Sequence, residues 1–301
     1  LSIALMTAAL VFILAPMLYR GAQAIVFRGT VEFRLLMLEE FSRGDPERIK
    51  AEAEEARKAR QPVYDMMAAY EEGVGSRMKE LLAGLEPLKQ MSDRIERRID
   101  RKTERILQTE DRERQVYRAE GVLLDLEDRI DDEEALARIQ TLQARLKEIK
   151  EPTEEFASLK TALKELLGPL PGDDKPVILH EQYGQTRWEG AEKMLDKVLR
   201  KVVWDYSSGR GRKTFVERET LFKGTEVEPL FDYLEEHAGE MLRPRLTFYW
   251  QFLTDVSKDM HFFGGIRAEL LGTFYLTVGA ILFAVPMGVI AAIYLCEYAT
   301  E

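Results

Sequence analysis

The chain has 301 residues, of which 32% are charged, with a formal net charge of −10 and a mean hydropathy of −0.26. These values suit a soluble protein, but the apolar residues are concentrated at the two ends, so we expect a soluble region between two membrane segments. The negative charge argues against nucleic acid, or an anionic lipid surface, as the main partner of that region. Cys296 is the single cysteine, which excludes a disulfide within the chain.

The first segment, residues 1–27, is predicted to be a transmembrane helix. Its uncharged run over residues 1–19 is just long enough to cross a bilayer. A cleaved signal peptide is the alternative, although the run is long for one and no cleavage pattern follows Pro16. Arg20 and two later arginines favour a cytoplasmic connecting region, but a loop of more than about 60 residues translocates whatever its charge. Because the chain begins without methionine and ends just after an apolar run, we expect a piece of a longer protein.

Residues 28–170 are highly charged and are predicted to be helical. Asp45 and Pro46 have the form of an N-cap and a first-turn proline that open a helix over residues 47–60. Pro62 and Pro87 are expected to divide or kink the following helices, and Pro152 to break a later one.

Two apolar series in this region predict an antiparallel helical hairpin, with one long solvated helix as the alternative. The first series alternates steps of four and three residues, as in a coiled coil, until polar residues occupy the next positions, Thr109 and Glu113. Its members are Leu81, Leu85, Leu88, Ser92, Ile95, Ile99, Lys102 and Ile106. The second follows a predicted turn and cap at Asp131 and Asp132; its members are Leu136, Ile139, Leu142, Leu146 and Ile149.

After a Gly/Pro-rich linker at 168–174, residues 171–246 are predicted to form a small α+β module. Strands are expected at 177–179, 202–206 and 215–216, and helices at 188–201 and 227–242. Trp188, Trp204 and Tyr206 are interpreted as core residues of this module rather than as a ligand site. The fold class is therefore mainly α, with transmembrane helices at both ends flanking a helical hairpin and a small α+β module.

No motif in the chain predicts catalysis, so we expect neither an enzyme nor a cofactor. The loop 209–214 (GRGRKT) lacks the glycine that a phosphate-binding loop requires before its lysine. His180, His237 and His261 are far apart and have no metal-ligand spacing.

The last two segments are predicted to approach and cross a membrane. Residues 247–268 are rich in aromatic residues, a composition typical either of a segment at the membrane headgroup region or of a helix packed in a protein core. Residues 269–301 include the uncharged run 270–296, about 40 Å long as a helix and therefore longer than the roughly 30 Å hydrocarbon core. A bend is expected at Pro286, with the freed carbonyl satisfied by a hydroxyl such as that of Thr277 or by packed helices. Small residues repeat every four positions and predict a partner helix on one face, with a simple tail anchor as the alternative; they are Ala280, Ala284, Gly288 and Ala292.

Five short motifs in residues 264–299 carry a family resemblance: GGI at 264–266, LGT at 271–273, VPMG at 285–288, AIYL at 292–295 and EYA at 297–299. Together they resemble the start of the permease domain of PstA, a permease subunit of the phosphate-specific ABC transporter. The strong resemblance covers about a tenth of the chain, and the preceding region corresponds in position to an extracytoplasmic insertion of some PstA-like proteins.

The resemblance implies a multi-pass inner-membrane protein with residues 28–265 outside the cytoplasm. It also implies a sister permease, ATP-binding subunits that carry the ATPase activity, and an extracytoplasmic phosphate-binding protein as partners. The later helices and the cytoplasmic loop that docks on the ATPase are not in this sequence, and no phosphate-contacting residue is assigned. A two-span membrane sensor or scaffold with an extracytoplasmic coiled-coil domain is the alternative.

Overall fold

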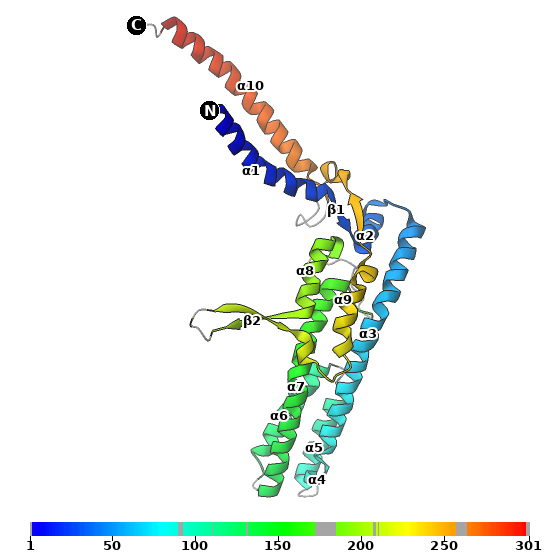
Figure 1. Ribbon diagram of the computed structural model, residues 1–301. Coiled ribbons are helices and arrows are strands. Elements are labelled where there is room, and N and C mark those ends of the chain that lie inside the picture. Colours follow the sequence, from blue (N-terminus) through cyan, green and yellow to red (C-terminus); the bar gives the residue numbers. More distant parts are fainter. Residues whose placement is uncertain are drawn as a thin grey trace. The chain divides into compact units, whose positions relative to one another are not determined.

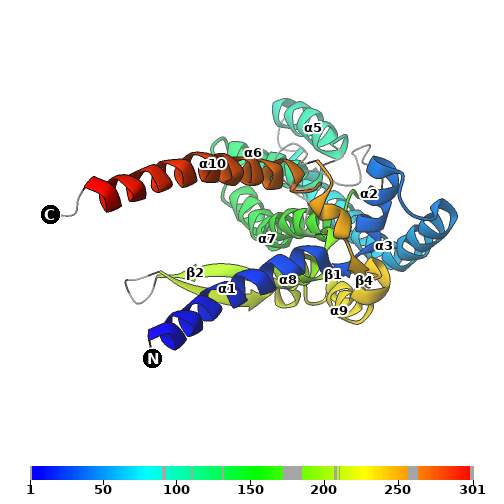
Figure 2. The ribbon, with the colours of Figure 1, turned by 90° about the horizontal axis from the view of Figure 1, so that it is seen from above.

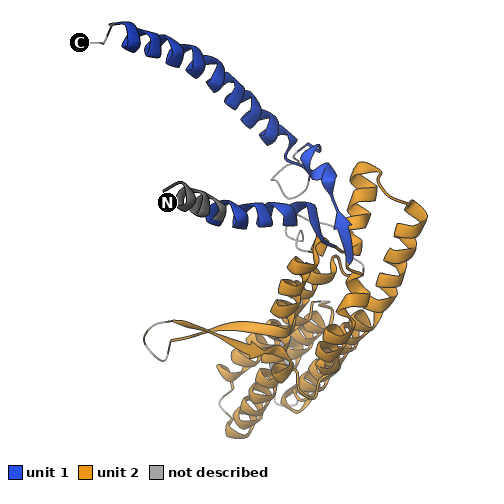
Figure 3. Cartoon of the chain, turned by 45° about the horizontal axis from the view of Figure 1, so that its top comes forward, with its two compact units in different colours: residues 1–28, 245–301 blue, residues 29–244 orange. Residues whose placement is uncertain are grey.

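The computed structural model describes residues 2–89, 93–109, 111–130, 132–171, 185–206, 209, 211–256 and 264–298. The chain forms two compact units, one of residues 1–28 with 245–301 and one of residues 29–244 (Figure 3). The second unit is thus inserted, in sequence, between the two parts of the first. Several predictions fall outside the described residues: the strand at 177–179 and the positions of Ser92, Asp131, His180, Arg210 and His261.

The first unit consists of two helices, a small sheet and one short turn of helix. Its elements are α1 (Ser2–Ile25), β1 (Val26–Gly29, whose last residue begins the second unit), β4 (Arg245–Phe248), η3 (Trp250–Leu253) and α10 (Arg267–Tyr298). Strands β1 and β4 pair with each other, and the Tyr249 backbone N–H donates to the Ile25 carbonyl at 2.7 Å. The chain therefore leaves α1 and returns toward α10 through one two-stranded ribbon.

The second unit is a helical bundle with one β-hairpin. Its elements are α2 (Val31–Phe41), α3 (Pro46–Ala83), α4 (Glu86–Lys89), α5 (Asp93–Leu107), α6 (Arg112–Glu127), α7 (Glu133–Leu167), α8 (Trp188–Leu199), β2 (Arg200–Asp205), β3 (Arg212–Glu217), η2 (Arg218–Leu221) and α9 (Glu228–Leu242).

Two long helices run through the whole bundle. At about 1.5 Å per residue, α3 is about 57 Å long and α7 about 52 Å. At one end α6 packs against both of them, with α5 beside α6; at the other end α9 packs against α3 and α8 against α7 (Figures 1 and 2). Helices α3 and α7 are therefore shared by two successive layers of the bundle.

One hydrophobic core extends along the bundle and includes side chains from Val63 to Leu242. Aromatic rings join the elements near its middle: Tyr70 of α3 lies 4.4 Å from Phe156 of α7 and 5.9 Å from Phe222, measured between ring centroids. Phe222 is in turn 5.8 Å from Phe231 of α9. The core thus takes in both predicted regions, 28–170 and 171–246, within the single unit 29–244.

Capping residues and sequence patterns near the helix ends correctly predicted several helix boundaries. The Asp45 carboxylate accepts hydrogen bonds from the backbone N–H groups of Glu47 and Arg48, and Pro46 is the first residue of α3. Asp132 caps α7 by accepting a hydrogen bond from the Ala135 N–H at 3.0 Å. Helices α8 and α9 and strands β2 and β3 occur where the sequence pattern predicted them.

The expectation that Pro152 would break its helix is wrong, and Pro62 does not divide α3. A helix boundary does lie beside Pro87, between the end of α3 at Ala83 and the short helix α4. Pro62 lies inside α3 and Pro152 inside α7, and both helices continue past them. Core packing explains this at Pro152, because the next turn buries Thr153, Glu155 and Phe156, and the Thr153 hydroxyl donates to the Ile149 carbonyl at 2.7 Å. Packing on both sides therefore outweighs the lost hydrogen bond.

The first apolar series is distributed over three helices rather than along one coiled-coil arm. Its buried members are Leu81 at the end of α3, Leu85 and Leu88 around α4, and Ile99 and Ile106 in α5. The second series lies on α7, where Ile139, Leu142 and Leu146 are buried. The antiparallel hairpin is therefore too simple a description of what is a bundle of several helices.

The interpretation of Trp204 and Tyr206 as core residues is also wrong, because both are exposed on the β2–β3 hairpin. Trp188 is half-buried against the core. The hairpin extends away from the helices (Figure 1), so a two-stranded ribbon cannot enclose its own aromatic side chains.

Candidate functional site

Helix α10 is long and apolar enough to cross a membrane. Within residues 267–297, an 18-residue stretch has a mean hydropathy of 2.4, and none of that stretch is buried inside the protein. An apolar helix exposed all round is typical of a segment surrounded by lipid or by other membrane helices. Among the described residues it is the one candidate span; the N-terminal run forms helix α1, and that it crosses the membrane remains a prediction.

The small residues predicted to pack against a partner helix are all exposed on α10; they are Ala280, Ala284, Gly288 and Ala292. At Gly288 an added Cβ would meet no atom within 4 Å, so the face is open to a neighbouring helix. Helix α10 continues through Pro286. The Thr277 hydroxyl donates to Thr273 at 2.8 Å, so it does not satisfy the carbonyl freed by the proline.

A glycine pair forms the turn before α10. Gly264 has φ +112, which favours glycine. A Cβ at Gly265 would collide with the backbone carbonyls of Phe252 and Asp255. The Ile266 N–H donates to the Phe252 carbonyl at 2.9 Å. The GGI motif therefore has a local structural reason: it lets α10 begin against the 250–255 turn.

The aromatic segment before α10 is divided between the two predicted roles. Tyr249 is buried, and its hydroxyl donates to the Asp255 carboxylate at 2.7 Å. Phe248 and Trp250 are exposed, as expected of side chains at a headgroup region. Core packing thus accounts for Tyr249 and not for its two neighbours.

Arg34 joins the two points where the chain enters and leaves the inserted unit. Its guanidinium donates to the Gly29 carbonyl at 3.0 Å and to the Arg243 carbonyl at 2.9 Å. Its Nε also lies 2.9 Å from the buried Glu52 carboxylate. One charged side chain thus brings the two ends of residues 29–244 together.

A second buried ion pair lies in the same region. The Arg60 guanidinium is 2.8 Å from the Glu32 carboxylate, with side-chain exposures of 10% and 3%. It also donates to the Met241 carbonyl at 2.8 Å and to the Leu167 carbonyl at 2.9 Å. Arg60 therefore connects α2, α3 and the C-terminal ends of α7 and α9. The sequence analysis did not single out Arg60. Its position on the apolar stripe of α3, between Ala56 and Val63, is the signal that could have indicated a buried charge.

A third charged cluster attaches the β-hairpin to α7. The buried Glu155 carboxylate pairs with Arg218 after β3 and with Lys201 of β2. The Arg218 guanidinium also lies 3.3 Å from the Ser158 hydroxyl. Both ends of the hairpin are therefore tied to one carboxylate.

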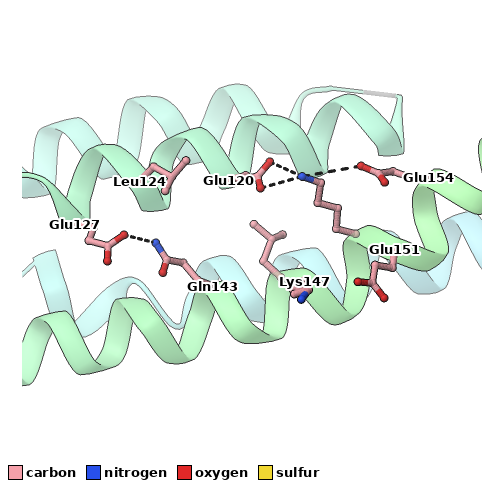
Figure 4. Close-up of a pocket in the computed structure, with 9 residues that line it drawn as sticks. Glu120, Leu124, Glu127, Gln143, Lys147, Glu151 and Glu154 are labelled. Carbon is pink, nitrogen blue, oxygen red and sulfur yellow. Dashed lines mark hydrogen bonds and ion pairs between the residues drawn. The ribbon is translucent and has the colours of Figure 1, made fainter. Parts of the chain in front are cut away.

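A groove with a volume of about 440 Å³ lies between α6 and α7 (Figure 4). Lys150 donates to both Glu120 oxygens at 2.9 Å, and the Glu127 carboxylate accepts a hydrogen bond from the Gln143 amide at 2.7 Å. The hydrogen bond to Glu120 raises the pKa of Lys150. Because these side chains satisfy one another across the groove, they join the two helices, and nothing in their arrangement indicates a ligand.

The described residues contain no group of three or more His, Cys, Asp or Glu side chains that could hold a metal ion. Of the three histidines, the structure describes His237, which stacks on Tyr233 with 4.2 Å between ring centroids. Of the segment 209–214, residues 212–214 belong to strand β3, where Lys213 is 5.2 Å from the centre of the Trp204 ring.

These features define a class: a chain with a candidate membrane helix and a large helical unit inserted before it. Comparisons with protein-family models, with curated proteins and with solved structures found no match.

Proposed function

We propose that this chain is part of a membrane-spanning permease subunit of an ATP-driven importer of inorganic phosphate. The observation that supports the proposal is α10, an apolar helix of sufficient length whose small residues form one open face and whose sequence resembles the start of the PstA-like permease domain. The open face is the place for a neighbouring permease helix.

In this proposal α1 is a further transmembrane helix, the protein is a multi-pass protein of the inner membrane, and residues 28–265 lie outside the cytoplasm. A sister permease forms the translocation pathway with it, and ATP hydrolysis takes place on separate ATP-binding subunits. The inserted unit is on the side from which an extracytoplasmic phosphate-binding protein delivers phosphate. The β1–β4 ribbon supports an insertion, because the chain leaves and returns beside itself.

Uptake of radiolabelled phosphate tests the proposal. Disrupting the gene in its host should abolish most ATP-dependent phosphate uptake at low phosphate concentration, and restoring the gene should recover it. Unchanged phosphate uptake would reject the permease and leave the two-span sensor or scaffold.

Substitutions on α10 test the helix-packing face separately. Gly288→Leu should abolish co-purification of the sister permease, because a large side chain keeps the helices apart. Gly279→Leu is the matched control: it is nine positions away, about half a turn round the helix, and is equally open. Equal effects of the two variants would count against this face.

A further inference from the structure

The β2–β3 hairpin presents an aromatic and basic face that no described residue covers. Residues opposite each other in the antiparallel register share a face, and so do residues two apart on one strand. The pairs Val202 with Phe215 and Trp204 with Lys213 therefore lie on one face. The exposed fractions are 45% for Val202, 50% for Trp204, 59% for Phe215 and, beyond the strand, 68% for Tyr206.

The opposite face of the hairpin is attached to the bundle at its base, whereas Val203, further along it, is 40% exposed. Lys201 lies one position away from Val202 and pairs with Glu155 of α7. The Arg218 pair with the same carboxylate fixes the second strand. The aromatic face is consequently held outward by a buried ion-pair cluster at the base of the hairpin.

The aromatic side chains are also organised among themselves. Lys213 lies over the Trp204 ring at 5.2 Å. Gly211 lies where an added Cβ would approach Tyr206 at 2.9 Å and Trp204 at 3.3 Å, so its lack of a side chain gives both rings room. Tryptophan, tyrosine and phenylalanine beside lysine is a composition that proteins place at the headgroup level of a bilayer.

We propose that this face, formed by Val202, Trp204, Tyr206, Lys213 and Phe215, binds a lipid headgroup surface and prefers anionic lipids. A bilayer is the occupant that the rest of the chain favours, because α10 is a candidate span. Lys213 supplies positive charge on this face for lipid phosphates, although the chain as a whole carries −10. The net charge that argues against a lipid surface for the whole region does not describe this hairpin. The proposal does not depend on phosphate transport.

Tryptophan fluorescence of the full chain in lipid nanodiscs tests the proposal without altering the hairpin. With Trp188→Phe and Trp250→Phe, Trp204 is the one remaining tryptophan. In nanodiscs containing phosphatidylglycerol, its emission should shift to shorter wavelength, headgroup-proximal brominated lipids should quench it, and aqueous iodide should quench it several-fold less than in phosphatidylcholine nanodiscs.

Charge variants in the same background identify the contact. Lys213→Glu should abolish the response to phosphatidylglycerol, whereas Lys193→Glu, at an exposed position of α8, should leave it unchanged. Full quenching by iodide in both nanodiscs would overturn the proposal. A blue shift without quenching by brominated lipids would overturn it too, by showing that a protein surface, such as a second copy, covers Trp204. Equal lipid quenching in both nanodiscs would overturn the preference for anionic lipids.

Discussion

Arg60 shows at the scale of one residue how the inserted unit is closed. Its guanidinium satisfies one carboxylate and two helix-terminal carbonyls that are otherwise shielded from water. A buried charge that loses its partner costs about 3–5 kcal/mol. The free energy of unfolding should therefore depend strongly on Arg60 and weakly on its exposed neighbours.

We expect Arg60→Met to destabilise the chain by about 3–5 kcal/mol, because it leaves the Glu32 carboxylate buried and unpaired. Urea unfolding followed by circular dichroism measures this loss. Arg57→Met, three residues earlier on α3 at an exposed ion pair, should leave the unfolding midpoint unchanged. Adding Glu32→Leu to Arg60→Met should recover part of the loss; no recovery would show that the ion pair is not its cause.

Tyr70, in the buried aromatic cluster, should make the free energy of unfolding depend on pH in the alkaline range. Burial raises the pKa of Tyr70 to about 12, although the hydrogen bond between Tyr70 and Thr153 and the charge of Arg77 lower it in part. In the unfolded chain a tyrosine has a pKa of about 10. The protonated phenol is thus favoured by folding, and its stabilising contribution is complete below pH 10 and lost as the pH rises toward 12.

Between pH 10 and pH 12 this group alone should lower the free energy of unfolding by about 1.4 kcal/mol per pH unit. In Tyr70→Phe that part of the pH dependence should be absent, as measured by urea unfolding at several alkaline pH values. Phe231→Leu is the control, because it disturbs the same cluster without removing a titrating group and should destabilise equally at each pH. Parallel pH profiles for Tyr70→Phe and the original chain would contradict the prediction.

At the scale of elements, α7 shows tertiary packing overriding a local signal. Pro152 lacks a backbone N–H and its ring opposes the Glu148 carbonyl, yet the helix runs unbroken from Glu133 to Leu167. The buried turns on both sides hold it in place. Pro152 should therefore make an unfavourable local contribution to the free energy of folding, which the packing of the neighbouring turns outweighs.

We expect Pro152→Ala to stabilise the chain by about 1–3 kcal/mol, since an internal proline costs about 3 kcal/mol relative to alanine and packing recovers part of it. Thermal unfolding by calorimetry measures the gain. Pro46→Ala is the control at the first position of α3, where a proline is well tolerated, and should change stability little. A loss of stability in Pro152→Ala would mean that the proline ring itself is needed for packing.

Sequence reasoning was successful where the cause is local. The caps at Asp45 and Asp132, helices α8 and α9 and the two hairpin strands follow from residues within a few positions of one another. It failed where distant residues decide the outcome: packing continues α7 through Pro152, and Trp204 is exposed rather than part of a core. The α10 span could be predicted because its apolar run exceeds the bilayer thickness, whereas the buried partners of Arg60 come from α2, α7 and α9.

At the scale of the whole molecule, α10 predicts on which side of a membrane the parts of the chain lie. If α10 crosses the bilayer, Cys296 at its end and the inserted unit are on opposite sides. The single cysteine makes this directly measurable, because it can be removed and one reporter thiol introduced elsewhere.

We expect a membrane-impermeant maleimide to label Lys193→Cys, in a Cys296→Ser background, from outside intact cells. Native Cys296 should react only in inverted vesicles. The Cys296→Ser chain without a new cysteine reports background labelling. Labelling of both positions from the same side would show that α10 does not span.

The hydrogen bonds from Arg34 to the Gly29 and Arg243 carbonyls have a consequence for modularity. Since the two ends of residues 29–244 lie beside one guanidinium, the gap left by removing them is short enough for a few glycine and serine residues. A shortened gene of this kind would show which functions of the protein need the large insertion and which need only the membrane part. The excised residues could in turn be inserted into another protein, at a loop whose ends lie equally close together.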